Sequence, residues 1–290
     1  MGPGQFEVDE EAADRALERT LIQTGVLLLQ VGQVEIEPGF TYARTENDVP
    51  TVVTEGGQLF VGTESVRRNT FVADVAFRVG LPFESQFEVS VPYRWVDEST
   101  VTIVGFSEID ETTESDSAIG DVRVGLAKTF LHEGSWWPDL VGRLIWDSDT
   151  GDTVGEDVLF GRGFNEISGV LSAVKRQDPL AFVGAIAYTS AFEKDDIKPG
   201  DSIDFSLGAL LAASPQTSLS FNFRQSFINE LEFDGSAIGG SDQVVALASI
   251  GASSIVGKNK LLRITGDIGL TDAAPDYAIG LSLGWRFTAF

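Results

Sequence analysis

Apolar side chains recur at every second position from about residue 32 to the end of the chain. This period is typical of β-strands whose two faces meet different surroundings. In one segment the apolar face reads Phe87, Val89, Val91, Tyr93 and Trp95. The pattern predicts roughly twelve strands of about ten residues, which is the length that crosses a bilayer when tilted. Two of them, near residues 164–176 and 243–253, have an ambiguous facing.

Charged residues occupy the opposite face of these segments, among glycine, alanine, serine and threonine. If the strands close into a barrel, this face lines the lumen. The lumen-wall residues that we predict are Asp74, Arg78, Glu88, Arg94, Asp121, Arg123, Arg143, Arg224, Arg263 and Arg286. Both signs of charge are present, so we expect the wall to select neither cations nor anions strongly.

Alternation alone does not separate a membrane barrel from a soluble sandwich, because both have one apolar face. The connections between the predicted strands separate the two. Long polar connections (43–66, 97–118, 147–163, 192–202 and 228–243) alternate with tight ones (80–85, 131–138, 176–179, 213–217 and 254–259). One connection on the side of the long loops, the last one, near residues 271–275, is short. Long loops on one rim and short turns on the other are typical of outer-membrane barrels. The sequence therefore predicts a 12-stranded antiparallel transmembrane β-barrel.

Aromatic residues cluster near both predicted strand ends, as in the interfacial belts of membrane barrels. The long-loop end carries Trp95, Trp146, Tyr188 and Phe227, and the short-turn end carries Phe87, Phe130, Trp136, Trp137, Phe182 and Phe287. The last residue, Phe290, is out of phase with this face, so we take Phe287 as the terminal aromatic residue in phase.

A different pattern precedes the strands. From about residue 9 to residue 24, apolar residues are spaced by three and four, as in an amphipathic helix. We divide the chain into an N-terminal segment with this helix, 1–31, and a barrel, 32–290. A twelve-stranded ring is too wide for side chains alone to fill, and the connection to the first strand is short. The helix can therefore fold back into the lumen as a plug.

Charged residues of the helix are the candidate gate. We expect Asp14 and Glu18 to pair with wall arginines, and Arg15 and Arg19 with wall acids. The alternative is a helix that hangs in the periplasm or associates with another copy.

Composition narrows the function. The 290 residues carry a net charge of −24, which argues against nucleic-acid partners, and no run of roughly 20 apolar residues could form a spanning helix. There is no cysteine, and the one histidine, His132, falls in a rim turn where a structural hydrogen bond is expected. The stretch from Asp147 to Asp152 is faintly similar to a calcium loop, but its glycine stands one place early. We therefore expect no enzyme activity, no metal and no cofactor.

Two blocks of sequence resemble a known family. The stretches from Ala12 to Leu29 (AADRALERTLIQTGVLLL) and from Gly32 to Tyr42 (GQVEIEPGFTY) resemble the helix and first strand of the secretion channel of the functional-amyloid (Fap) system. The stretches from Gly120 to Lys128 (GDVRVGLAK) and from Asp147 to Asp152 (DSDTGD) are similar to patterns of the wider group of barrels named after the phenol meta-cleavage pathway.

The Fap resemblance implies a homotrimer of barrels in the bacterial outer membrane, each gated by its helical plug. Its partners would be membrane lipid and the unfolded amyloid subunits that it exports from the periplasm to the cell surface. The wider group implies an alternative, a passive diffusion channel for small hydrophobic or aromatic solutes. A third possibility is a structural barrel whose lumen is permanently filled.

Overall fold

A computed structural model describes residues 10–55, 58–104, 107–151, 163–257 and 259–288. Within these ranges, side chains are described from Leu17 onwards, apart from those of residues 55 and 107–109. Phe290, whose phase was in question, lies outside the described residues.

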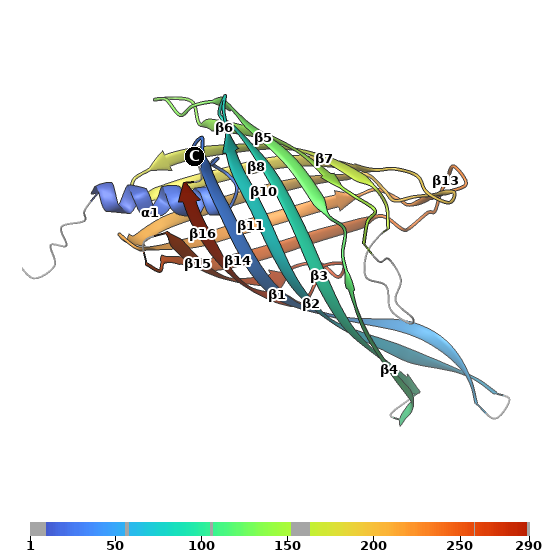
Figure 1. Cartoon of the computed structure of the whole chain (residues 1–290). Coiled ribbons are helices and arrows are strands. Elements are labelled where there is room, and N and C mark those ends of the chain that lie inside the picture. Colours follow the sequence, from blue (N-terminus) through green and yellow to red (C-terminus); the bar gives the residue numbers. More distant parts are fainter. Residues whose placement is uncertain (1–9, 56–57, 105–106, 152–162, 258, 289–290) are drawn as a thin grey trace, which may run out of the picture.

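Twelve long antiparallel strands form the closed barrel that the sequence predicts (Figure 1). They are β1 (Gln33–Glu55), β2 (Gln58–Leu81), β3 (Ser85–Val104), β5 (Arg123–Leu131), β6 (Asp139–Asp147), β7 (Glu166–Gln177), β8 (Leu180–Ala191), β10 (Ser202–Ser214), β11 (Thr217–Ile228), β14 (Gln243–Ile255), β15 (Lys260–Gly269) and β16 (Tyr277–Thr288). The ring closes because β1 pairs with β2 on one side and with β16 on the other. Closure gives every strand two neighbours, which leaves no open edge in the hydrocarbon. Both strands of ambiguous facing are present, as β7 and β14.

Large apolar side chains cover the outside of the ring. On β10, for example, Leu207 is 68% exposed, whereas its neighbour in the alternate phase on the same strand, Leu210, is buried inside. Trp95, Trp146 and Trp285 are also about half exposed on the outer face. Exposed apolar area on this scale has no place in water, so the outer face meets lipid. The predicted assignment of the two faces is confirmed.

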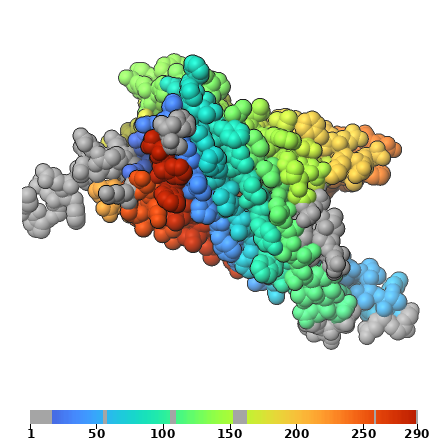
Figure 2. All heavy atoms as spheres, in the orientation of Figure 1, coloured from blue at the N-terminus to red at the C-terminus, as the bar shows by residue number. Residues whose placement is uncertain are grey.

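The short turns lie where the tight connections were predicted, but two of the predicted long loops are wrong. Residues 43–66 and 97–118 continue as strands instead, because β1 and β2 stay paired as far as Glu55 and Gln58, and β3 pairs with β4 (Ser107–Ile119). Their many threonines and valines favour a strand even where the neighbouring residues are charged. We call this projection of β1–β4 the outer ribbon; it extends beyond the barrel as a narrow slab (Figure 2).

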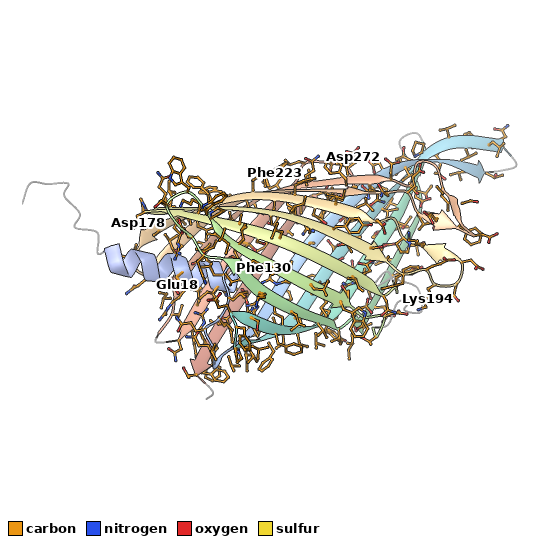
Figure 3. The ribbon with its side chains drawn as sticks, turned by 90° about the horizontal axis from the view of Figure 1, so that it is seen from above. Glu18, Phe130, Asp178, Lys194, Phe223 and Asp272 are labelled. Carbon is orange, nitrogen blue, oxygen red and sulfur yellow. The ribbon has the colours of Figure 1, made fainter. Side chains whose placement is uncertain are left out.

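Three short strands, β9 (Ile197–Lys198), β12 (Glu232–Phe233) and β13 (Ser236–Ala237), pair with one another at the long-loop end. Of the predicted loop 147–163, residues 152–162 lie outside the described part of the chain. Helix α1 (Glu10–Gln23) lies at the opposite end of the barrel. Figure 3 shows Glu18 of α1 near Asp178 at this end and Lys194 at the other. Within the described residues, no helix is long and apolar enough to cross a membrane.

A glycine ends α1. The amide of Val26 donates to the carbonyl of Leu21, and the amide of Gly25 donates to the carbonyl of Ile22, each at 2.9 Å. Gly25 adopts φ of +76°, so the end is a Schellman motif with glycine in its left-handed position. The chain turns there and reaches β1 within a few residues, which places the second half of α1 inside the ring.

A pair of neighbouring substitutions tests which face meets lipid. Ile186 points outward from β8, whereas Ala187 points into the lumen, opposite Asp204 of β10. We expect Ile186→Arg to destabilise the barrel by about 2–4 kcal/mol, because its guanidinium would enter hydrocarbon. Ala187→Arg should cost much less, since the lumen supplies a carboxylate. Urea unfolding in lipid vesicles measures both; an equal loss of stability would contradict the assignment of faces.

Candidate functional site in the barrel lumen

The buried side of α1 packs on a small apolar patch of the lumen wall. Leu17 and Leu21 are buried against Val174 of β7, Ala181 of β8 and Leu210 of β10. These wall residues form one apolar patch on an inner face that also carries many charged residues. The patch therefore fixes which side of the helix turns toward β7–β10.

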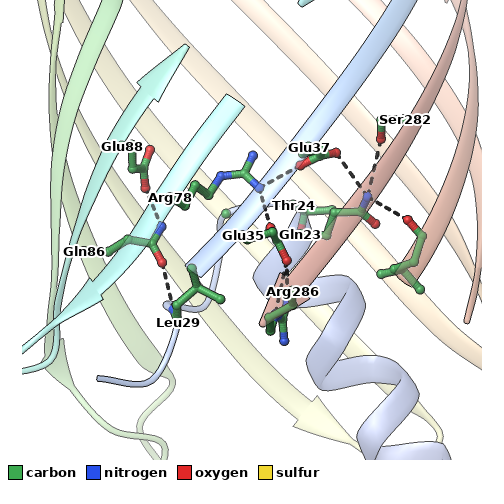
Figure 4. A network of polar contacts seen from close by, with 12 residues as sticks. Gln23, Thr24, Leu29, Glu35, Glu37, Arg78, Gln86, Glu88, Ser282 and Arg286 are labelled. Carbon is green, nitrogen blue, oxygen red and sulfur yellow. Dashed lines mark hydrogen bonds and ion pairs between the residues drawn. The ribbon is translucent and has the colours of Figure 1, made fainter. Parts of the chain in front are cut away.

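Uncharged side chains hold the opposite side of α1. The hydroxyls of Thr20 and Ser253 of β14 lie 2.9 Å apart. The amide nitrogen of Gln23 donates to Oε1 of Glu37 at 3.1 Å, and it lies 3.4 Å from both the Leu261 carbonyl and the Ser282 hydroxyl (Figure 4). Two of these three groups only accept hydrogen bonds, so the amide must face them with its nitrogen. Gln23 is fully buried, and its Oε1 has no partner among the described residues.

The linker after α1 is also attached to the wall. Arg143 of β6 donates to the carbonyl of Gly25 at 2.6 Å and pairs with Glu88 of β3 at 3.0 Å. The Leu29 amide donates to Oε1 of Gln86 at 2.8 Å, and the nitrogen of the same Gln86 side chain donates to Glu88 at 2.7 Å. Arg143, Glu88 and Gln86 thus form one group that binds the linker through its backbone.

Beside the helix, a ladder of alternating charges crosses four strands. Glu35 of β1 pairs with Arg286 at 2.8 Å and with Arg78 at 2.7 Å. Arg78 also pairs with Glu37 at 2.7 Å, and Arg263 lies 3.5 Å from Glu37. Strand register produces the ladder, because Glu35 stands opposite Arg78 on β2 and Arg286 on β16. Both glutamates are buried, and buried carboxylates need such partners.

The other predicted wall residues lie farther toward the long-loop end. Arg123 pairs with Asp147 at 2.8 Å, and Asp121 accepts a hydrogen bond from the Gly151 amide at 2.9 Å. On the far wall, Arg224 pairs with Asp204 at 2.8 Å. Asp74 and Arg94 lie against the backbone of Gly39 and Gly120 respectively. The structure therefore brings Arg78, Glu88, Arg143, Arg263 and Arg286 together around the helix end, and places the remaining predicted wall residues away from it.

The predicted contacts of the charged helix residues can be followed for two of the four, Glu18 and Arg19. Glu18 is exposed and Arg19 is partly exposed, and among the described residues neither forms an ion pair with the wall. The side chains of Asp14 and Arg15 lie outside the described part of the structure. The attachments pass instead through Thr20, Gln23 and the Gly25 carbonyl. The sequence carries a pattern that could have indicated these attachments: two uncharged polar residues stand three positions apart in the last turns of the helix, and a glycine follows them.

His132 has a structural environment, as its place in a turn suggested. Its Nε2 donates to Oε1 of Glu84 at 2.9 Å, and Asp139 lies 3.7 Å from its Nδ1. The hydrogen bond to Glu84 raises the pKa of His132 above its ordinary value. The described residues contain no cluster of side chains arranged to hold a metal ion.

No protein-family model matches this sequence. Among solved structures, the COG4313 outer membrane channel from Pseudomonas putida F1 is similar over 90% of this chain and 97% of that chain, with a TM-score of 0.66 and 14% identity. The translocator domain of the autotransporter NalP from Neisseria meningitidis is similar over 97% of this chain and 98% of that chain, with a TM-score of 0.49 and 12% identity. The Ralstonia pickettii toluene transporter TbuX is similar over 90% of each chain, with a TM-score of 0.42 and 9% identity.

The first similarity shows a shared fold, and the other two are too weak to carry an argument. Together with the apolar outer face and the charged lumen, the fold defines a transmembrane β-barrel of the bacterial outer membrane. The architecture implied by the wider resemblance is thereby supported. The more specific resemblance to the amyloid secretion channel stays a hypothesis.

Removing the polar attachments should loosen the helix. Thr20→Val and Gln23→Leu together keep the volume but delete hydrogen bonds to Ser253 and Glu37. At about 1 kcal/mol for each residue, the closed state loses about 2 kcal/mol, which is roughly a 30-fold shift toward the open state. Single-channel recording measures the open fraction. Glu18→Gln, at an exposed position of the same helix, is the matched control and should leave the open fraction unchanged. An unchanged open fraction in the double variant would show that Thr20 and Gln23 do not hold the helix in the lumen.

A substitution at the helix end tests the linker. Gly25→Ala places a Cβ at positive φ, and that Cβ lies 3.2 Å from Nη2 of Arg143. The left-handed conformation costs a non-glycine residue about 1–2 kcal/mol, so we expect trypsin to cleave after Arg19 roughly 5 to 30 times faster. At Gly134 an added Cβ meets nothing within 4 Å, so trypsin should cleave the Gly134→Ala variant at the wild-type rate. Equal rates in the two variants would show that the Gly25 turn does not retain the helix.

Proposed function

We propose that this chain is a bacterial outer-membrane channel that exports unfolded amyloid subunits from the periplasm to the cell surface, and that α1 is its removable plug. The observation that carries the proposal is the manner of attachment. The lumen end of α1 is held by hydrogen bonds of its own uncharged side chains and by a small apolar patch, while the neighbouring wall charges are paired among themselves. A plug of this kind can leave without stranding a buried charge.

The same contacts keep the channel closed at rest. Releasing α1 into water exposes Leu17, Leu21 and Ile22, at a cost of roughly 1.5–3 kcal/mol for each side chain. Spontaneous opening is therefore rare. An arriving substrate whose apolar segments cover the wall patch would offset part of this cost, which would couple opening to the presence of substrate.

The lining of the lumen favours a polypeptide over a small apolar solute. Layers of arginine and carboxylate follow the path from Glu35 and Glu37 near the helix to Arg123 and Asp147 beyond it. Such a wall offers hydrogen-bonding partners to a polar extended chain, but no continuous apolar surface to a hydrocarbon. Export needs no nucleotide in this scheme, because the subunits order into cross-β fibrils outside the cell and the free energy of that ordering favours net outward movement. We further propose that the channel works as the homotrimer that the family resemblance implies.

A disulfide between plug and wall provides the test. The chain has no cysteine, and the hydroxyls of Thr20 and Ser253 lie 2.9 Å apart, so Thr20→Cys with Ser253→Cys introduces one defined pair. Under oxidising conditions, we expect cells with the double variant to lose surface fibrils while subunits stay in the periplasm, and a reductant to restore export. Fibril staining and immunoblots of cell fractions measure both.

Each single-cysteine variant controls for the substitutions themselves. Surface fibrils that persist when the pair is fully oxidised would contradict a removable plug. If loss of the whole chain slows growth on an aromatic carbon source and leaves fibrils untouched, the passive diffusion channel replaces the export channel.

A further inference from the structure

Three lysines point outward from strand ends at the rim with the short turns. Lys175 of β7 pairs with Glu133 at 3.1 Å. Lys260 of β15 lies over the ring of Trp285, 5.4 Å from its centroid. The third, Lys128 of β5, is exposed and donates at 3.3 Å to the carbonyl of Phe83, and it has no carboxylate partner among the described residues. Lys128 and Lys260 therefore have no carboxylate partner in the described part of the protein, but Lys260 lies over an aromatic ring, whereas the ammonium of Lys128 donates to a backbone carbonyl.

A groove of about 910 Å³ lies beside Lys128 on the outer wall, across β5, β6, β7, β8 and β10. Large apolar side chains form its sides, among them Leu126, Phe130, Leu144, Leu171, Ile186 and Tyr188. Two outward-facing glycines line it, and Gly169 leaves it hollow. A Cβ on Gly169 would meet nothing within 4 Å, whereas the Phe130 ring folds down over Gly142.

Strand register joins the lysine to the groove. Lys128 stands opposite Gly142, and Gly142 stands opposite Leu171, so the three share one row on the outer face. Lys128 is three residues from the end of β5, which places its Cα roughly 7–10 Å inside the rim. A lysine at this depth can extend its ammonium to the level of the lipid headgroups.

We propose that this groove binds one phospholipid of the periplasmic leaflet, with an acyl chain in the hollow over Gly169 and the phosphate on the ammonium of Lys128. Charge decides for a phospholipid, because its phosphate complements the ammonium of Lys128, which has no carboxylate partner among the described residues, and its acyl chain complements the apolar sides. The site depends on the position of the chain in the membrane and not on the export function. Its floor includes Arg143, whose side chain holds the Gly25 carbonyl on the inner side of the wall.

Native mass spectrometry of the full chain, released from detergent containing dioleoylphosphatidylglycerol, tests the site. Wild-type protein should retain one lipid. Lys128→Gln removes the charge, and Gly169→Leu fills the hollow. Each should lower the fraction of protein that retains lipid about tenfold, because the first deletes one charged hydrogen bond and the second removes the space for the acyl chain. Lys260→Gln and Gly184→Leu are matched controls, because Lys260 has its own partner in Trp285 and Gly184 faces lipid outside the groove.

The outcomes separate the proposal from its alternatives. Retention that is equal in all five proteins, or absent in wild type, would overturn it. Displacement of the lipid by inorganic phosphate would also overturn it, since the acyl chain would then contribute nothing. A wild-type oligomer that dissociates in the Gly169→Leu variant would assign the groove to a second copy of the chain. Heat-modifiable gel migration shows that each variant is folded, and Lys128→Gln, which changes no packing, keeps the test valid if Gly169→Leu does not fold.

Discussion

Everything in this molecule depends on the closure between its first and last barrel strands. Inside hydrocarbon an unpaired backbone amide costs several kcal/mol, so β1 must pair along both of its edges. The β1–β16 ladder meets this demand from Gln33 to Arg44. It also places Glu35 between an arginine of β2 and an arginine of β16, so the closure that satisfies the backbone assembles the charge ladder of the lumen as well.

The barrel and its plug are therefore energetically separate to a large degree. Arg78, Arg263 and Arg286 neutralise the two buried glutamates without help from α1, and the helix adds a single amide hydrogen bond to Glu37. The ring can keep its structure whether the helix is in or out. The linker is different, because Gly25 and Leu29 bind the wall through backbone atoms, so their attachment depends on the wall side chains Arg143 and Gln86 and on the left-handed turn at Gly25.

The two ends of the barrel have different designs. At the short-turn end, the group that binds the linker and the groove beside Lys128 lie on opposite sides of the same part of the wall, and both include Arg143. At the other end, β1–β4 continue outward as a ribbon instead of collapsing into loops. One edge of the ribbon, β4, is rich in acids such as Glu111, Glu114 and Asp116, which discourage pairing with another strand.

The barrel, its strand number and its two faces could be predicted from the sequence, because a period of two with tight turns on one rim admits few other closed arrangements. We predicted the ten wall residues from the same alternation; nine of them lie in strands, and Asp121 lies just before β5. Which of them meet the helix did not follow, since this depends on register between strands far apart in the chain, as for Glu35 and Arg286. The charge of Glu18 suggested an ion pair with the wall. In the folded protein Thr20 and Gln23 face the wall instead, and Glu18 is exposed. Periodicity determines which side of a strand or helix is apolar, and only packing decides which neighbour that side meets.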